Sequence, residues 1–128
     1  MKPLGEQFAA ISAAFPGATL APSQGLHLIV IPTVELPSGW TQSRTHIRFV
    51  VPSGYPYAAP DCFWTDAALR LEGGRLPQNT RAGHLMPGQP DANTLWFSWH
   101  VQNGQWNPAK CDLGTYVAII RRRFEARS

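Results

Sequence analysis

The segment Pro52-Ser53-Gly54-Tyr55-Pro56-Tyr57-Ala58-Ala59-Pro60 divides this 128-residue chain into a strand-rich first part and a second part that carries the candidate reactive residues. Its three prolines restrict the backbone, because the pyrrolidine ring fixes φ and disfavours the α region for the residue before it. The segment therefore predicts a rigid, extended crossing that connects the strands before it to the strand that follows.

The residues before this crossing predict one helix and then antiparallel strands. Apolar side chains recur at helical spacing from Leu4 to Phe15, and the pattern ends at Pro16-Gly17. Three strand-like runs follow: Ala18 to Ala21, the β-prone run Leu26 to Ile31, and the alternating run Arg44 to Val51. Since no crossover helix separates these runs, we expect an antiparallel meander.

The residues after the crossing predict one more strand, a long loop and a helix. Cys62-Phe63-Trp64 is expected to be the fourth strand, and residues 66–94 to form a long ordered loop with a small hairpin at Gly73-Gly74. Asp112 is a plausible N-cap for the closing helix. Residues 1–128 are therefore expected to form a single α+β domain with an N-terminal helix, a four-stranded antiparallel meander, a long active-site loop and a C-terminal helix.

Composition excludes several classes of protein. The charged fraction of 15% and the hydrophobic fraction of 44% are typical of a globular chain. The net charge of +3 is concentrated near Arg121-Arg122-Arg123, where a helix end accounts for it, so nucleic acid is not an expected partner. Two cysteines do not make a disulfide scaffold, and no apolar run has the length of a signal peptide or membrane span. A cytoplasmic protein without membrane contact is expected.

Aromatic residues are dense in Thr94-Leu-Trp-Phe-Ser98-Trp-His100-Val-Gln-Asn-Gly-Gln-Trp106-Asn-Pro108, which is the candidate reaction centre. Such side chains need a core to bury their large apolar area. A hydroxyl and an imidazole stand among them at Ser98 and His100. Asn103-Gly104 suits a chain reversal, because both residues tolerate positive φ.

Two motifs carry a resemblance to a known family. The crossing has the form P-x-x-Y-P-x-x-x-P, and a W-x-P-A element precedes the last helix, with Trp106, Pro108 and Ala109 at its defined positions. With the order of elements, the chain resembles the ubiquitin-conjugating enzymes, and most of all their divergent bacterial members. The resemblance covers nearly the whole chain but lacks the last helices of the eukaryotic enzymes.

The chain departs from that family at the catalytic position. The family's thioester-forming cysteine lies eight residues before the tryptophan of W-x-P-A, where this chain has Ser98. The family's His-Pro-Asn triplet is also missing, and the nearest candidates for a supporting role are His84 and Asn93. The span from Tyr55 to Ser98 is longer than is usual in the family, so we expect a rebuilt loop.

The resemblance implies carriage of an acyl group, the C-terminus of a ubiquitin-like protein, in a bacterial conjugation pathway. Its partners would be that ubiquitin-like protein and an ATP-dependent activating enzyme, which the N-terminal helix would contact; no cofactor is expected and the target is unknown. A serine hydroxyl needs a neighbouring base, and His100 projects to the same side as Ser98 in an extended segment. The expected intermediate is an oxyester on Ser98, with Asn93 or a backbone N–H near the oxyanion.

Other readings stay open. The second hypothesis is a catalytically inactive variant of the fold that acts as a binding scaffold for the ubiquitin-like protein or its activating enzyme. Cys111 is an alternative nucleophile, since a thiol near a helix N-terminus has a lowered pKa in many proteins. Cys62 is interpreted as a core residue. A zinc site built from these cysteines with His84 and His100 would lack paired ligand spacing, so no metal is expected.

Overall fold

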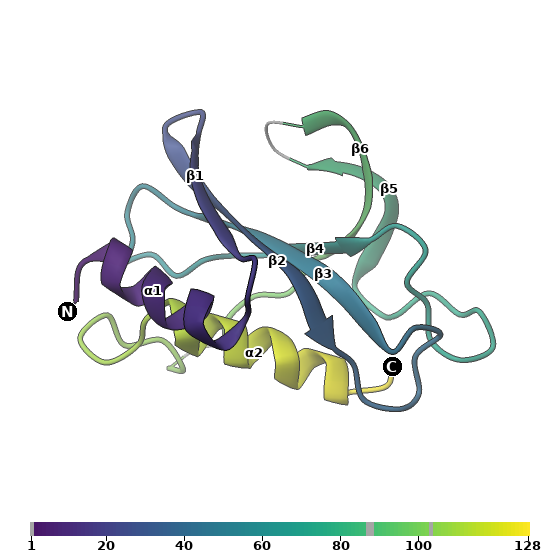
Figure 1. Ribbon diagram of the computed structural model, residues 1–128. Coiled ribbons are helices and arrows are strands. Elements are labelled where there is room, and N and C mark those ends of the chain that lie inside the picture. The colour runs from purple at the N-terminus through teal and green to yellow at the C-terminus, as the bar shows by residue number, and fades with distance from the viewer. Residues whose placement is uncertain (1, 87–88, 103) are drawn as a thin grey trace.

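A six-stranded antiparallel sheet carries two helices on one of its sides (Figure 1). The computed structural model describes residues 2–86, 89–102 and 104–128. Its elements are α1 (Leu4–Ala14), β1 (Thr19–Ser23), β2 (Leu26–Glu35), β3 (Arg44–Val51), β4 (Phe63–Asp66), β5 (Thr80–Met86), β6 (Gln89–Phe97) and α2 (Leu113–Glu125). This is an α+β architecture, as the sequence predicts.

The first four strands form the predicted meander. The sheet order is β1-β2-β3-β4-β6-β5, and each of the first three neighbouring pairs is antiparallel. β2 continues past Pro32, where the register with β3 shifts between Ile31 and Val34. A bulge is one of the few places within a sheet that tolerates proline. β4 begins at Phe63, one residue later than expected.

The prediction of a long loop over residues 66–94, and with it a four-stranded sheet, is wrong. β5 and β6 pair with each other as an antiparallel hairpin, and β6 also pairs with β4, so the sheet has six strands. In Figure 1 this hairpin curls away from the two helices. The chain does turn at Gly73-Gly74, where the Gly74 N–H donates to the Leu71 carbonyl at 2.9 Å, but residues 68–76 form no strand pair there.

The core lies between the sheet and α2. Alternation on β3 turns Ile47 and Phe49 inward, and α2 covers them with its apolar stripe. The buried residues of α2 are Leu113, Tyr116, Val117, Ile120, Arg123 and Phe124. Asp112 begins the helix as predicted, and forms a capping box with Thr115. In the described part of the chain, neither helix has the length and apolar character that a bilayer crossing requires.

Buried Gln7 connects α1 to the crossing and to α2. Its Oε1 accepts hydrogen bonds from the Tyr55 hydroxyl at 2.6 Å and from the Leu113 N–H at 3.0 Å. Its amide nitrogen donates to the Lys2 carbonyl at 2.8 Å. A single polar side chain therefore fixes three segments relative to one another.

The two motifs of the family resemblance contact each other. The Trp106 indole donates to the Pro56 carbonyl at 2.8 Å, and the Trp106 and Tyr55 rings lie 6.1 Å apart. The Tyr55-Pro56 peptide bond is cis. The crossing and the segment after β6 are thus held side by side, which sets the position of the residues between Ser98 and α2.

Candidate functional site

Ser98 lies immediately after β6, at the edge of the aromatic core. Its N–H donates to the Asn79 carbonyl at 2.8 Å, and the next N–H, from Trp99, donates to the Phe97 carbonyl at 3.0 Å. The residue is half-buried. The backbone at the candidate nucleophile is therefore held by hydrogen bonds on both sides, while its side chain still reaches the surface.

His100 is oriented by Asp61. The imidazole Nδ1 is hydrogen-bonded to the Asp61 carboxylate, and the side chains of the two residues are 64% and 59% exposed. A carboxylate only accepts, so Nδ1 carries the proton when Asp61 is ionised. Among the described residues no hydrogen bond joins the Ser98 hydroxyl to His100. The sequence did not single out Asp61, because it lies 39 residues from His100 and in no shared motif.

Cys62 stands beside this pair in an unusual backbone conformation. Its φ is 65°, in the left-handed region that non-glycine residues seldom occupy. Two hydrogen bonds hold it there: the Cys62 N–H donates to the Trp99 carbonyl at 3.2 Å, and the Tyr116 hydroxyl donates to the Cys62 carbonyl at 3.0 Å. The crossing is thereby attached both to the end of β6 and to α2.

The Cys62 thiol is part of the same polar group as Asp61 and His100. Burial raises the pKa of Cys62, and the negative Asp61 carboxylate raises it further, while hydrogen bonds from the Trp99 backbone and the Trp96 side chain act in the opposite direction. One potential metal-ligand atom of Asp61, one of Cys62 and one of His100 all lie within 4.8 Å of one another. An oxygen, a sulfur and a nitrogen atom, each able to bind a metal ion, therefore lie close together.

Arg123 packs against the two aromatic residues on either side of Ser98. Its guanidinium lies 5.3 Å from the Phe97 ring centroid and 5.2 Å from that of Trp99, and the residue is 3% exposed. It donates to three carbonyls, those of Gln78, Ala126 and Ser128, each at 2.9 Å. Burial lowers the pKa of this arginine. The two residues that flank Ser98 in sequence thus rest on a buried cation.

Cys111, the alternative nucleophile, lies directly before the N-cap of α2 and is half-buried. Its sulfur accepts from the Asn107 N–H at 3.3 Å and donates to the Gln105 carbonyl at 3.6 Å. Burial raises the pKa of Tyr55 to about 12, with smaller contributions from Asp112 and Cys111. The thiol therefore has hydrogen-bond partners within its own loop.

The two supporting candidates lie on the β5–β6 hairpin. His84 pairs in register with Thr94, and exposed Asn93 with Leu85; the side chain of His84 is outside what the structure describes. Asn93 precedes Ser98 by five residues of extended chain, which is about 16 Å along the strand. The structure does not bring Asn93 to Ser98. Gly104 has a φ of 80°, as a turn requires, and Asn103 lies outside the described residues.

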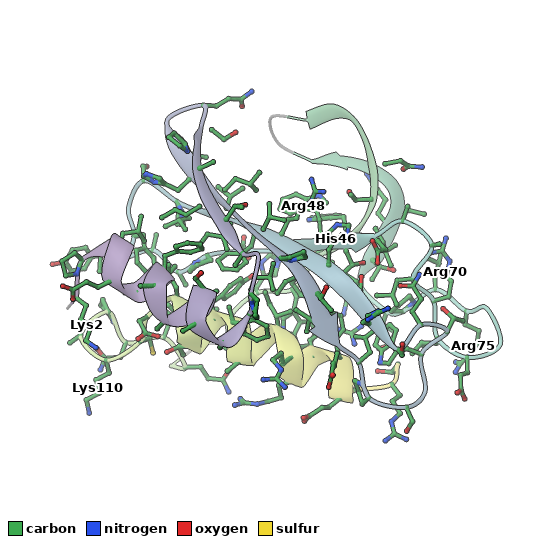
Figure 2. All side chains as sticks on the ribbon, in the orientation of Figure 1. Lys2, His46, Arg48, Arg70, Arg75 and Lys110 are labelled. Carbon is green, nitrogen blue, oxygen red and sulfur yellow. The ribbon has the colours of Figure 1, made fainter. Side chains whose placement is uncertain are left out.

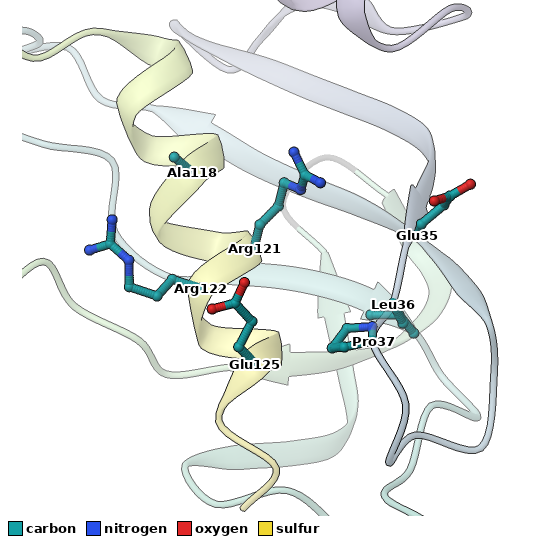
Figure 3. Close-up of a pocket in the computed structure, with 7 residues that line it drawn as sticks. All are labelled: Glu35, Leu36, Pro37, Ala118, Arg121, Arg122 and Glu125. Atoms are coloured by element: carbon teal, nitrogen blue, oxygen red, sulfur yellow. The ribbon is translucent and has the colours of Figure 1, made fainter.

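A hollow of about 530 Å³ lies elsewhere, between the C-terminal half of α2 and the end of β2 (Figure 3). It is lined by Glu35, Leu36, Pro37, Ala118, Arg121, Arg122 and Glu125. A smaller hollow of about 230 Å³ is lined partly by Trp99, His100 and Arg123. Of the two, only the smaller touches the residues described above, so volume alone does not identify the site.

Comparison with known proteins supports the family suggested by the motifs. The profile of the family described as "Prokaryotic E2 family E" matches residues 18–127, which include the whole sheet and α2. Neither the curated proteins nor the solved structures contain a significant match to the chain. The match covers most of the sequence, and it includes the crossing, the aromatic stretch and the capped closing helix. The chain belongs to prokaryotic E2 family E.

Proposed function

We propose that this chain is an acyl carrier for a ubiquitin-like protein in a bacterial conjugation pathway, with Ser98 as the nucleophile and His100 as its base. Membership of an E2-like family implies an E2-like role and, in general, partners of two kinds: a ubiquitin-like protein and its activating enzyme. The oxyester on Ser98 is the specific part of the proposal.

The observation that carries the proposal is the Asp61–His100 pair close in sequence to a half-buried serine. A nucleophilic hydroxyl needs an adjacent base, and the base in turn needs a third group that orients it. Asp61 accepts from Nδ1 of His100, which leaves Nε2 for a second partner. The imidazole is largely exposed, so its side chain can change rotamer, and catalytic hydrogen bonds often tighten only when the substrate is bound.

The chemical step is an exchange of acyl groups. The Ser98 Oγ attacks the activated carbonyl carbon while His100 takes the hydroxyl proton. The bond from that carbon to the activating enzyme's leaving group then breaks, and the leaving group takes the proton from His100. In the second step an amine attacks the same carbon, the bond from that carbon to the Ser98 Oγ breaks, and the proton lost by the amine passes to the Ser98 Oγ as the amide forms.

The proposal is tested by charging the protein with ATP and the ubiquitin-like protein and activating enzyme encoded by neighbouring genes. We expect an adduct that survives thiol reductant and is cleaved by hydroxylamine or alkali. Ser98→Ala should abolish it, whereas Ser98→Cys should convert it to an adduct that reductant removes. His100→Gln should slow charging by about 10²–10⁴-fold, the usual contribution of a general base.

Cys111→Ala is the matched control, because it removes the other candidate nucleophile. An adduct that persists in Ser98→Ala but is lost in Cys111→Ala would contradict the assignment to Ser98. Absence of any adduct, together with stable binding of the ubiquitin-like protein or the activating enzyme, would favour the second candidate function, a non-catalytic scaffold. The observation that favours this candidate is that no hydrogen bond joins the Ser98 hydroxyl to His100 among the described residues.

The contact between α1 and the activating enzyme belongs to the same proposal. Deleting residues 1–15 is a poor test of it, because buried Ile11 and Gln7 connect the helix to the rest of the fold. Glu6 lies on the exposed part of α1, so Glu6→Arg leaves the helix in place. Slower charging of this variant is the expected result, with only a small loss of thermal stability, because Glu6 lies in the first turn of α1 where a negative charge is favourable.

A further inference from the structure

Asp61, Cys62 and His100 present three different ligand atoms to one point. A carboxylate oxygen, a sulfur and a ring nitrogen lie within 4.8 Å of one another. Four-coordinate zinc has ligand bonds of about 2.0–2.3 Å, so its ligand atoms lie about 3–4 Å apart. The separations in this cluster are therefore within reach of metal coordination after small side-chain movements.

The backbone holds the sulfur in place. Cys62 is 9% exposed and has a positive φ, and its own N–H and carbonyl are both hydrogen-bonded, to Trp99 and Tyr116. Residues kept in sparsely populated conformations by their surroundings concentrate at functional sites. The side chains of Asp61 and His100 are exposed, so an ion from solvent would meet them first and the buried Cys62 thiol last.

A bound ion would replace the hydrogen bonds that now join the three side chains of the cluster. The Asp61 carboxylate accepts from Nδ1 of His100 and is also hydrogen-bonded to the Cys62 thiol. Both protons point at one negatively charged group. With the thiol deprotonated, the carboxylate and the thiolate together carry two negative charges, which balance a divalent cation.

From this convergence we propose that Asp61, Cys62 and His100 form a binding site for a divalent transition metal of the zinc class. Sulfur and nitrogen ligands select zinc and its neighbours in the first transition row over calcium and magnesium, which prefer oxygen. Three protein ligands leave the fourth position to water, as in zinc sites that bind an exogenous group. The site does not need Ser98, but it shares Asp61 and His100 with the proposed charging reaction, so a bound ion would compete for the imidazole that serves as the base.

The test is direct titration of the reduced protein with Co²⁺ and with Zn²⁺, without modifier or activating enzyme. We expect one Co²⁺ per chain and a near-ultraviolet absorption band from thiolate-to-cobalt charge transfer, which excess Zn²⁺ removes. Cys62→Ser should abolish the band. His100→Gln and Asp61→Asn, at exposed positions that leave folding intact, should each weaken binding by at least about 10-fold.

Cys111→Ser is the matched control, because it removes the other thiol and should leave the titration unchanged. A band that disappears in Cys111→Ser but remains in Cys62→Ser would overturn the proposal. So would a wild-type protein that shows no thiolate band and binds no stoichiometric Zn²⁺. If the wild-type protein binds metal as expected but is not charged with the ubiquitin-like protein, the proposed function is contradicted and the metal site is not.

Discussion

Two histidine–aspartate pairs occur among the residues that the structure describes, and they differ in their surroundings. His46 and Asp66 meet at 2.6 Å between β3 and β4, on the sheet face turned away from the helices (Figure 2), with side chains 18% and 40% exposed. The Thr45 hydroxyl donates to the second oxygen of Asp66 at 2.9 Å. His100 and Asp61 lie outside the strands and are mostly exposed.

The two pairs differ in how much solvent reaches the histidine. Burial lowers the pKa of His46 below its ordinary 6.5 and outweighs the attraction of Asp66, which acts to raise it; nearby Arg48 also lowers it. The Nε2 atom of His46 is buried without a partner among the described residues. His100, by contrast, has solvent, a thiol and a serine within its neighbourhood. The same two side chains therefore serve packing in one place and are available to a substrate or ion in the other.

The largest expected effect on stability comes from removing Arg123, which packs against Trp99, the residue next to His100. Arg123→Ala leaves three carbonyls without their charged donor and removes a cation from two aromatic rings. We expect a loss of about 3 kcal/mol in the free energy of unfolding, measured by urea denaturation. The NMR signals of His100 should shift, while those of His46 should stay.

Arg122→Ala is the control for this prediction. It removes the same type of side chain from the next position of α2, but Arg122 is exposed. Its effect should be below about 0.5 kcal/mol, as for ordinary surface substitutions. Equal losses in the two variants would mean that Arg123 does not have the anchoring role assigned to it.

The second prediction concerns the more enclosed pair, His46 and Asp66. Asp66→Asn weakens the acceptor for both His46 and Thr45 within a sheet, so a loss of about 1–2 kcal/mol in unfolding free energy is expected. Chemical denaturation of the variant measures it directly.

The parallel substitution at the exposed pair, Asp61→Asn, should cost less than about 0.5 kcal/mol, because solvent screens an exposed ion pair. Its effect should be seen instead in metal binding and in charging. If Asp61→Asn destabilised the fold as much as Asp66→Asn, the distinction between the two pairs would fail.

The smallest expected effect is a dependence of the free energy of unfolding on pH. The pKa of His46 is lower in the folded state than in the unfolded chain, so the unfolded state binds more protons between the folded pKa and 6.5. Stability should therefore fall as pH decreases through 6.5, by at most about 1.4 kcal/mol per pH unit from this residue. The His46→Gln variant should lack this component in a series of denaturation curves, whereas His100→Gln should retain it.

Much of the fold could be predicted from local pattern. The apolar spacing of α1, the alternation of β3 and the cap at Asp112 each act within a few residues, and all three were predicted correctly. The β5–β6 hairpin could not be predicted in the same way, because residues 80–97 contain glycine and proline and no clear alternation. Its strand β6 is stabilised by pairing with β4, a contact between distant segments.

The site was predictable only in part, for the same reason. Ser98 and His100 lie in a dense aromatic stretch that draws attention by itself. Asp61 and Cys62 become relevant only because the Cys62–Trp99 hydrogen bond brings the crossing to the end of β6. The residue pattern within neither segment predicts this contact between Cys62 and Trp99. Whether the serine acts as a nucleophile stays a prediction for the charging experiment.

The sheet order β4-β6-β5 has a consequence for how the molecule is assembled during folding. β4 cannot acquire its second neighbour until the intervening chain has closed a loop and β6 has arrived. Pairing between segments distant in sequence is slow, because the entropy of loop closure is lost before any contact is gained. Asp61 and His100 both lie just beyond one end of this late pairing, where Phe63 of β4 is opposite Phe97 of β6. Partly folded chains, with only the N-terminal meander formed, would therefore not yet hold Asp61 and His100 in contact.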